Sequence, residues 1–168
     1  MPKNYVTVES PIGPLMLAGE GGVLHVLAFQ SGPRAQGPDP SWTEAPGAFA
    51  GARAELDRYF AGTLRVFTAP IALHGTAFQL RVWEALRRIP YGETISYLEL
   101  ATRLGNPKAV RAVGLANGAN PLPLIVPCHR VIGSNGRLVG FGGGLPIKRA
   151  LLDHEQIDGQ IDRQIAIW

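Results

Sequence analysis

The chain contains a single cysteine, Cys128, which stands between Pro127 and the basic pair His129-Arg130. A thiol reacts as its thiolate, and neighbouring positive charge lowers the pKa of the thiol. One cysteine excludes a disulfide bond within this chain and a zinc site built on cysteines. A lone cysteine is most often a small buried hydrophobic residue. The basic neighbours favour the other interpretation, a nucleophile.

His129 is the nearest candidate base for Cys128, but the two residues are adjacent in the chain. In an extended segment their side chains point to opposite faces, which favours activation through a water molecule held by His129. A histidine base also needs a carboxylate that orients its ring, as in nucleophile–base–acid triads. A helix predicted over 147–155 carries two candidates, Asp153 and Glu155.

Two short helices are predicted before this segment. Ser96 and Glu99 have the spacing of a capping box, which predicts the start of the first helix. Asn106 followed by Pro107 suits an N-cap and a first-turn proline, which predicts a second helix that ends near residue 117. Two short helices joined by so tight a turn resemble a helix-turn-helix. An ordinary helical hairpin fits the pattern equally well.

The second of these helices carries mostly small side chains. Ala109, Ala112 and Ala116 are spaced so that they share one face. A helix that reads the major groove needs Asn, Gln or Arg at such positions, whereas a face without bulk suits close approach to the minor groove. Lys108 and Arg111 add positive charge beside it. The alternative is that the alanines pack against the protein's own core.

The first half of the chain has the pattern of a small α/β domain. Three strands are predicted at 5–8, 15–18 and 23–29, followed by a helix over about 48–61 and a strand-like run at 66–73.

The composition changes at His74-Gly75-Thr76, and Thr76 suits the cap of a helix over about 77–88. The sequence therefore predicts one domain at 1–75 and a second at 76–168.

The composition excludes some function classes. Nearly half of the 168 residues are apolar, so the chain is predicted to fold, and its net charge of +3 permits a polyanionic partner. The start of the chain lacks a secretory h-region, and no apolar run approaches the roughly 18 residues of a membrane span. These features predict a cytoplasmic protein without a membrane partner, or a nuclear one in a eukaryote.

The segment Pro127-Cys128-His129-Arg130-Val131 resembles the active-site signature of the O6-alkylguanine-DNA alkyltransferases, also called methylated-DNA–protein-cysteine methyltransferases. The likeness runs from about Gly75 to Glu155 and is weaker before that, although Ser10 to Leu15 also looks typical. Five further segments are similar to the family in the same order. They are Ile89–Thr94, Ser96-Tyr97, Arg111–Gly114, Asn117–Pro121 and Gly143–Leu145.

The resemblance implies a role for each matching residue. Cys128 would accept the alkyl group, His129 would act as a base through water, and Glu155 would orient His129. Asn120 would be a hinge residue whose amide hydrogen-bonds to the backbone before the cysteine. Tyr97 would lie near the flipped guanine and donate its hydroxyl to N3. The chain would act once, because the thioether product is stable.

The resemblance also implies how DNA and the base are held. Arg111 would fill the gap left by the flipped nucleotide, beside Lys108 and the alanine face in the minor groove. Backbone carbonyls of Cys128 and Val131 would accept the guanine amino group. The pocket would be lined by Pro123, Val131, Val139, Phe141 and Gly142. The implied fold is an N-terminal α/β domain with a small antiparallel sheet, followed by a mostly helical domain of winged-helix type that contains the helix-turn-helix.

The chain departs from the family pattern in two places. It lacks the cysteines of the structural zinc site that some members have, so no metal or cofactor is expected. In the pocket loop, Val139, Phe141 and Gly142 replace residues common elsewhere, and the stiff Val139 is expected to favour methyl over wide groups such as benzyl. The expected partner is duplex DNA containing alkylated guanine, with no obligatory protein partner.

Two rival hypotheses stay open at this point. The chain would be a DNA-binding module without chemistry if Cys128 were only structural. It would be a cysteine hydrolase if Cys128 and His129 turned over repeatedly.

Overall fold

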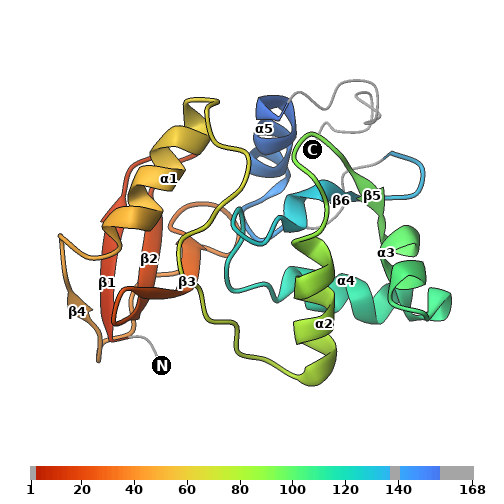
Figure 1. The fold of residues 1–168 in the computed structure, drawn as a ribbon, viewed down its shortest axis with the longest axis horizontal. Helices are drawn as coiled ribbons and strands as arrows, with labels where there is room; N and C mark the ends of the chain where they lie inside the picture. Colours follow the sequence, from red (N-terminus) through yellow and green to blue (C-terminus); the bar gives the residue numbers. More distant parts are fainter. Residues whose placement is uncertain (1–2, 137–140, 156–168) are drawn as a thin grey trace. The chain divides into compact units, whose positions relative to one another are not determined.

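The computed structural model describes residues 3–136 and 141–155. The chain divides into two compact units, Met1–His74 and Gly75–Trp168. The elements of each unit are labelled in Figure 1. Among the described residues, no helix has the length and apolar character needed to cross a membrane.

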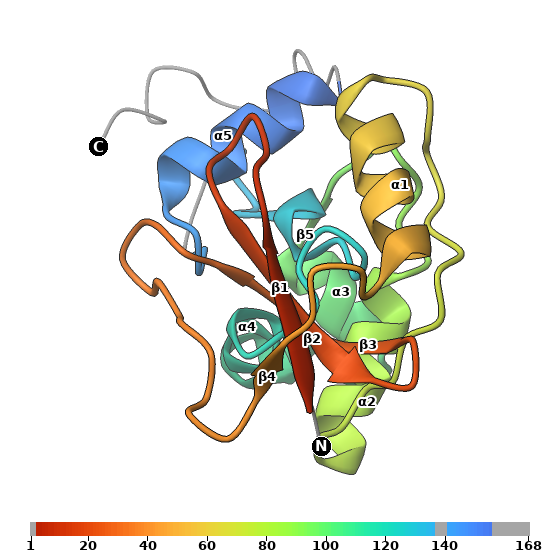
Figure 2. The same ribbon diagram turned by 90° about the vertical axis from the view of Figure 1, so that its left-hand side faces the viewer.

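The first unit contains a four-stranded sheet in the order β3-β2-β1-β4. Strands β1 (Asn4–Val8), β2 (Leu15–Glu20) and β3 (Val23–Phe29) lie where the sequence patterns predict strands. They pair antiparallel, and β1 and β2 run side by side in Figure 2. The short β4 (Thr43–Glu44) pairs parallel with β1, so the sheet is mixed. This fourth strand lies between the predicted strand at 23–29 and the predicted helix over about 48–61, where the sequence pattern predicts no strand.

Helix α1 (Ala50–Phe60) accompanies this sheet and buries Leu56 and Tyr59. The strand predicted at 66–73 is wrong, because this stretch makes only an isolated bridge between Leu24 and Ile71. The stretch touches β3 at this bridge but does not become a fifth strand of the sheet.

The second unit begins with α2 (Ala77–Leu86), which Thr76 caps. The Thr76 hydroxyl accepts from the Gln79 backbone N–H, and the Gln79 side chain accepts in return from the backbone N–H of Thr76, which completes a capping box. At α3 (Tyr97–Arg103), Ser96 accepts from the Glu99 N–H at 2.9 Å, as predicted.

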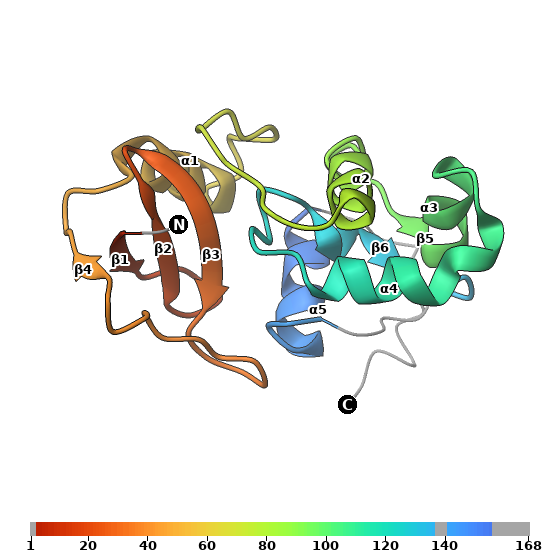
Figure 3. The same ribbon diagram turned by 90° about the horizontal axis from the view of Figure 1, so that it is seen from below.

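Helix α4 (Val110–Gly118) follows α3 after a short 3₁₀ turn at Pro107–Ala109, which Asn106 caps as predicted. Figure 3 shows α3 and α4 as neighbours joined by this turn. The indole Nε1 of the buried Trp83 on α2 donates to the carbonyl of Ala116 at 2.8 Å, which fixes the depth of α4 in the unit.

Two short strands and a last helix complete the second unit. Strand β5 (Ile95–Ser96) pairs parallel with β6 (Val131–Ile132), and α5 spans Leu145–His154. In this pair Ile95 lies opposite Val131 and Ser96 lies opposite Ile132. The pairing thereby holds the start of α3 beside the Cys128 segment.

Candidate active site around Cys128

Cys128 begins a 3₁₀ turn, Cys128–Arg130, and is 5 % exposed. The segment is therefore a turn at this point and not the extended chain considered above. The turn forms because the Arg130 N–H donates to the Pro127 carbonyl at 3.1 Å. The three residues of this turn, Cys128, His129 and Arg130, are all buried inside the unit.

The loop before the cysteine is held by Asn120, which follows the end of α4. Its Nδ2 donates to the Val126 carbonyl at 2.8 Å, and its Oδ1 accepts from the Leu122 N–H at 2.9 Å. Leu124 between them has a φ of 75°, a left-handed conformation that is strained for a branched residue by about 1 kcal/mol or more. Asn120 thus ties the end of α4 to the loop that positions Cys128.

His129 and Glu155 form a buried pair. His129 Nε2 lies 2.7 Å from Glu155 Oε2, and both side chains are inaccessible to solvent. Asp153, the other candidate, is exposed and pairs with Arg149 instead. The second ring nitrogen of His129, Nδ1, is buried and makes no hydrogen bond within the described residues.

Arg130 contacts the same carboxylate. Its Nε donates to Glu155 Oε1 at 2.8 Å and one of its terminal nitrogens donates to Oε2 at 3.1 Å. The other terminal nitrogen donates to the Ile89 carbonyl at 2.7 Å. Burial alone would raise the pKa of Glu155, but its hydrogen bonds and charge attraction with His129 and Arg130 lower it well below its ordinary range. Glu155 is therefore an anion at neutral pH.

The pKa of the Cys128 thiol is raised, which corrects the expectation drawn from its basic neighbours. Burial is the largest cause, and it outweighs a hydrogen bond with the Asn120 side chain and the charge of Lys148, both of which lower the pKa. Burial likewise lowers the pKa of His129 against the opposing effect of Glu155. Thiol and imidazole are therefore both neutral in the resting site.

Tyr97 is the first residue of α3 and lies close to Cys128. Burial, followed by the nearby Cys128, raises the pKa of Tyr97 to about 12, so the phenol stays protonated at neutral pH. The ammonium of Lys148 lies 5.8 Å from the centre of the Tyr97 ring. On the α4 side, a Cβ built on Gly114 would lie 3.9 Å from the ring, so α4 and α5 both pack against this tyrosine.

The exposed face of α4 differs from the predicted alanine face. Lys108, Arg111 and Ala112 are exposed, but Ala109 is half-buried and Ala116 is buried at 4 %. The prediction of a DNA contact for Ala116 is therefore wrong, because this residue faces the core of the unit.

The residues predicted to line the pocket are only partly described. Pro123 and Val131 are buried, and Phe141 and Gly142 are half-buried. A Cβ built on Gly142 meets nothing within 4 Å, so this position leaves open space. Val139 lies outside the described residues.

Sequence reasoning missed Lys148 on α5. Its side chain is fully buried, its Nζ donates to the Val131 carbonyl at 2.7 Å, and burial lowers its pKa to about 8. Lys148 lies seven residues, two helical turns, before Glu155. This spacing places both residues on one side of the helix, and it is the sequence signal that could have linked Lys148 to the site.

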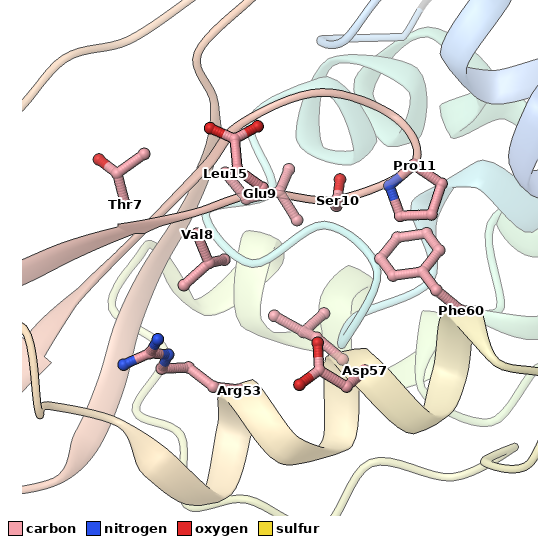
Figure 4. Close-up of a pocket in the computed structure, with 10 residues that line it drawn as sticks. Thr7, Val8, Glu9, Ser10, Pro11, Leu15, Arg53, Asp57 and Phe60 are labelled. Atoms are coloured by element: carbon pink, nitrogen blue, oxygen red, sulfur yellow. The ribbon is translucent and has the colours of Figure 1, made fainter.

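A pocket of about 500 Å³ lies in the first unit between β1 and α1 (Figure 4). Arg53 and Asp57 of α1 line one side of it, and Glu9, directly after β1, lines the other. None of the predicted site residues lines it, so it is separate from the Cys128 site.

The sequence matches two family descriptions that together span most of the chain. Residues 77–157 match "6-O-methylguanine DNA methyltransferase, DNA binding domain", and residues 4–73 match "6-O-methylguanine DNA methyltransferase, ribonuclease-like domain". The chain belongs to the O6-methylguanine-DNA methyltransferase family.

Relatives in this family resemble the chain over nearly its whole length. The methylated-DNA–protein-cysteine methyltransferase of Mycobacterium tuberculosis is 56 % identical over 91 % of this chain and 92 % of its own. That of Methanosarcina acetivorans is 51 % identical over 90 % and 97 %. The structure of M. tuberculosis OGT in complex with DNA superposes with a TM-score of 0.87 at 52 % identity, over 97 % and 96 % of the two chains. These likenesses confirm the predicted family and fold.

Proposed function

We propose that this protein repairs DNA by moving an alkyl group, mainly methyl, from O6 of guanine to Sγ of Cys128. The observation that carries the proposal is the arrangement at the 3₁₀ turn. A buried thiol stands next to a histidine whose Nε2 is held by Glu155 at 2.7 Å. The family membership and the likeness to a DNA complex support the substrate class.

The pKa shifts indicate that the Cys128 thiol is deprotonated only when it reacts. Because burial keeps the thiol of Cys128 and the ring of His129 neutral, a base has to remove the thiol proton, and a neutral imidazole is able to accept it. The anionic Glu155 orients Nε2 and stabilises the imidazolium that forms. We infer that the proton passes from Sγ to Nδ1 through a bridging water, because Nδ1 is buried and has no partner among the described residues.

The transfer step then balances within the site. The thiolate attacks the alkyl carbon, the bond from that carbon to O6 breaks, and its electron pair stays on guanine. Tyr97, protonated because its pKa is about 12, donates its hydroxyl to N3 and stabilises the departing anion. The new thioether has no hydrolytic route in this site, so each molecule reacts once.

The helix pair α3–α4 would dock on the minor groove of duplex DNA. Arg111 is exposed on α4, Lys108 is exposed in the 3₁₀ turn before it, and both charges complement the phosphates. Arg111 would enter the base stack after the damaged nucleotide rotates out. Asn120 would keep this helix and Cys128 in fixed relation through its two backbone hydrogen bonds. A protein with this role acts where the DNA lies, which is the cytoplasm in a bacterium.

The rotated base would enter a pocket walled by Pro123, Val131, Phe141 and Gly142. The carbonyls of Cys128 and Val131 would accept the guanine amino group, and the Val131 carbonyl already receives the Lys148 ammonium. A carbonyl has two lone pairs, so both donors fit. Lys148 would therefore position this acceptor.

Mass spectrometry after exposure to duplex DNA containing O6-methylguanine tests the proposal. We expect one methyl increment, confined to the Cys128 peptide, and repair that stops at one guanine per protein. The matched control is Cys128→Ser, which should bind the duplex yet stay unmodified, because an alkoxide is much harder to form than a thiolate. An unmodified wild-type protein would support the DNA-binding module without chemistry, and repeated turnover would refute the single-use mechanism.

A further inference from the structure

Leu115 is 73 % exposed, although it lies in the middle of α4. It follows Arg111 by four residues, so the two side chains lie one turn apart on the same face. The opposite face, with Val113, Ala116 and Asn117, is buried in the unit. Leu115 therefore lies on the side of the helix that carries the exposed Arg111.

The neighbours of Leu115 on this face are small. Ala112 precedes it by three residues, and Gly118 and Ala119 follow it by three and four, all of them exposed. Within residues 112–119, Leu115 is the only exposed side chain larger than a methyl group. Beyond Arg111 it is the one side chain on this face that projects from the helix.

The dimensions of the minor groove decide what such a side chain does there. An α-helix with its side chains is about 10–12 Å across, whereas the minor groove of B-DNA is only about 6 Å wide. The helix as a whole therefore cannot enter an unwidened groove. Individual long side chains on a face that is otherwise small are able to enter it.

We propose that Leu115 enters the minor groove as an apolar wedge, one turn from Arg111, and supplies a salt-independent part of DNA binding. The inference rests on the proposed function, because it takes duplex DNA as the partner of α4. Apolar wedges that open the minor groove are a general device of proteins that bind there. A single exposed leucine is common on protein surfaces, but this one shares its face with Arg111, and Lys108 is exposed in the turn before the helix.

The wedge and the cations differ in their response to salt. A cation that neutralises a phosphate releases a counterion, so its loss reduces the slope of log affinity against log salt concentration. Leu115 carries no charge, and its contact with sugars and base edges releases only water. Its removal should therefore weaken binding equally at every salt concentration. The contact also offers no hydrogen bond, so it does not select a sequence.

The test measures the dissociation constant of the full-length protein for an undamaged duplex over a range of salt concentrations. Leu115→Ala should bind roughly tenfold more weakly at each salt concentration, with a slope parallel to wild type. Leu115→Met, which keeps a long apolar side chain, should bind within about threefold of wild type. Lys108→Ala should lower the slope by about one. Val66→Ala, at a valine that is 70 % exposed in the first unit, should change nothing.

Each other outcome overturns the inference. If Leu115→Ala binds within twofold of wild type, or if its slope changes, Leu115 is not an uncharged wedge. If Leu115→Ala also slows the reaction with free O6-methylguanine, it acts through the packing of α4 and not through DNA. These results leave the proposed function intact, since that fails only if the wild-type protein itself neither binds the duplex nor transfers the methyl group.

Discussion

At the scale of single residues, burial sets the resting charges of the Cys128 site. It raises the pKa of the thiol and lowers that of His129, so the pair is neutral until the proton moves. The charges created by that movement arise next to groups already in place for them. Lys148 lies on the thiolate side and Glu155 on the imidazolium side. A preorganised site of this kind spends little energy on rearrangement during reaction.

The pair His129–Glu155 should make the protein sensitive to acid. Both groups have folded-state pKa values below their unfolded values of 6.5 and 4.5, so the unfolded chain takes up protons first as the pH falls. The stability that they contribute is present above pH 6.5 and is lost progressively below it. Denaturant unfolding measured between pH 7 and pH 4 should show this decline.

Glu155→Gln tests the same pair. It leaves Arg130 buried without its anion, so we expect a loss of about 3 kcal/mol at pH 7 and a flatter dependence on pH. Transfer to Cys128 should slow at least a hundredfold. A matched control is Asp153→Asn, at an exposed carboxylate two residues earlier, which should leave both quantities unchanged. A Glu155→Gln variant with wild-type acid sensitivity would contradict the assignment.

Lys148 is expected to cost stability while it assists the reaction. Burial lowers its pKa from 10.5 to about 8, a shift equivalent to about 3 kcal/mol, and its hydrogen bond to the Val131 carbonyl returns about 1 kcal/mol. Lys148→Met should therefore be more stable than wild type by about 2 kcal/mol at pH 7. The advantage should shrink as the pH rises from 8 to 10.5, because the wild-type lysine then loses its charge.

The same variant should react more slowly with free O6-methylguanine, because the charge that lowers the Cys128 pKa is gone. Lys108→Met, at an exposed lysine, is the control for a lost charge and should leave stability unchanged. Equal or lower stability of Lys148→Met at pH 7 would show that burial of this ammonium is not costly.

At the scale of elements, we expect α4 to assist extrusion of the damaged base and α3 to assist the transfer reaction. Arg111 is exposed on α4, whereas Tyr97 is half-buried at the start of α3 near Cys128. Arg111→Ala should slow repair of duplex DNA by about tenfold or more while reaction with free O6-methylguanine stays near wild type. Tyr97→Phe should slow both, because the lost donor acts on the leaving group in either case. Single-turnover rates of each variant on both substrates test these expectations. Equal rate losses on the two substrates for Arg111→Ala would refute its proposed role.

Local signals predicted the element boundaries well. Thr76, Ser96 and Asn106 all cap the helices assigned to them, because a cap depends on the few residues next to it. The run at 66–73 was misread as a strand, since its apolar residues met no partner strand beyond one bridge. Strand pairing is a contact between distant segments, and composition alone does not reveal it.

The site was predicted less completely, for a physical reason. Cys128, His129 and Glu155 have side chains with evident chemistry, so their types and order pointed to a triad. Lys148 and the pairing of Arg130 with Glu155 were missed because charged residues are usually exposed, and only the folded unit shows that these two are buried and paired. The face of α4 was misplaced because alanine fits both a core and a surface.

At the scale of the whole molecule, the described residues of the Cys128 site all come from the second unit, Gly75–Trp168. The hydrogen bonds among Asn120, the cysteine loop and α5 also stay within it. We expect a chain of residues 75–168 to react with free O6-methylguanine at a rate within about tenfold of the full protein. Methyl transfer to the purified unit measures this, and circular dichroism separates failure to fold from failure to react.

The junction between the units limits where this chain can be joined to foreign sequence. A Cβ on Gly75 would lie 2.7 Å from the Trp83 ring and 2.8 Å from Gln79 Oε1, so any other residue there displaces the indole or the capping side chain. That indole holds the Ala116 carbonyl of α4. A tag or fusion partner placed before the second unit should therefore end before Gly75 and leave Gly75 and Thr76 unchanged. A larger residue at position 75 would displace Trp83 and so shift α4, the helix proposed to dock on DNA.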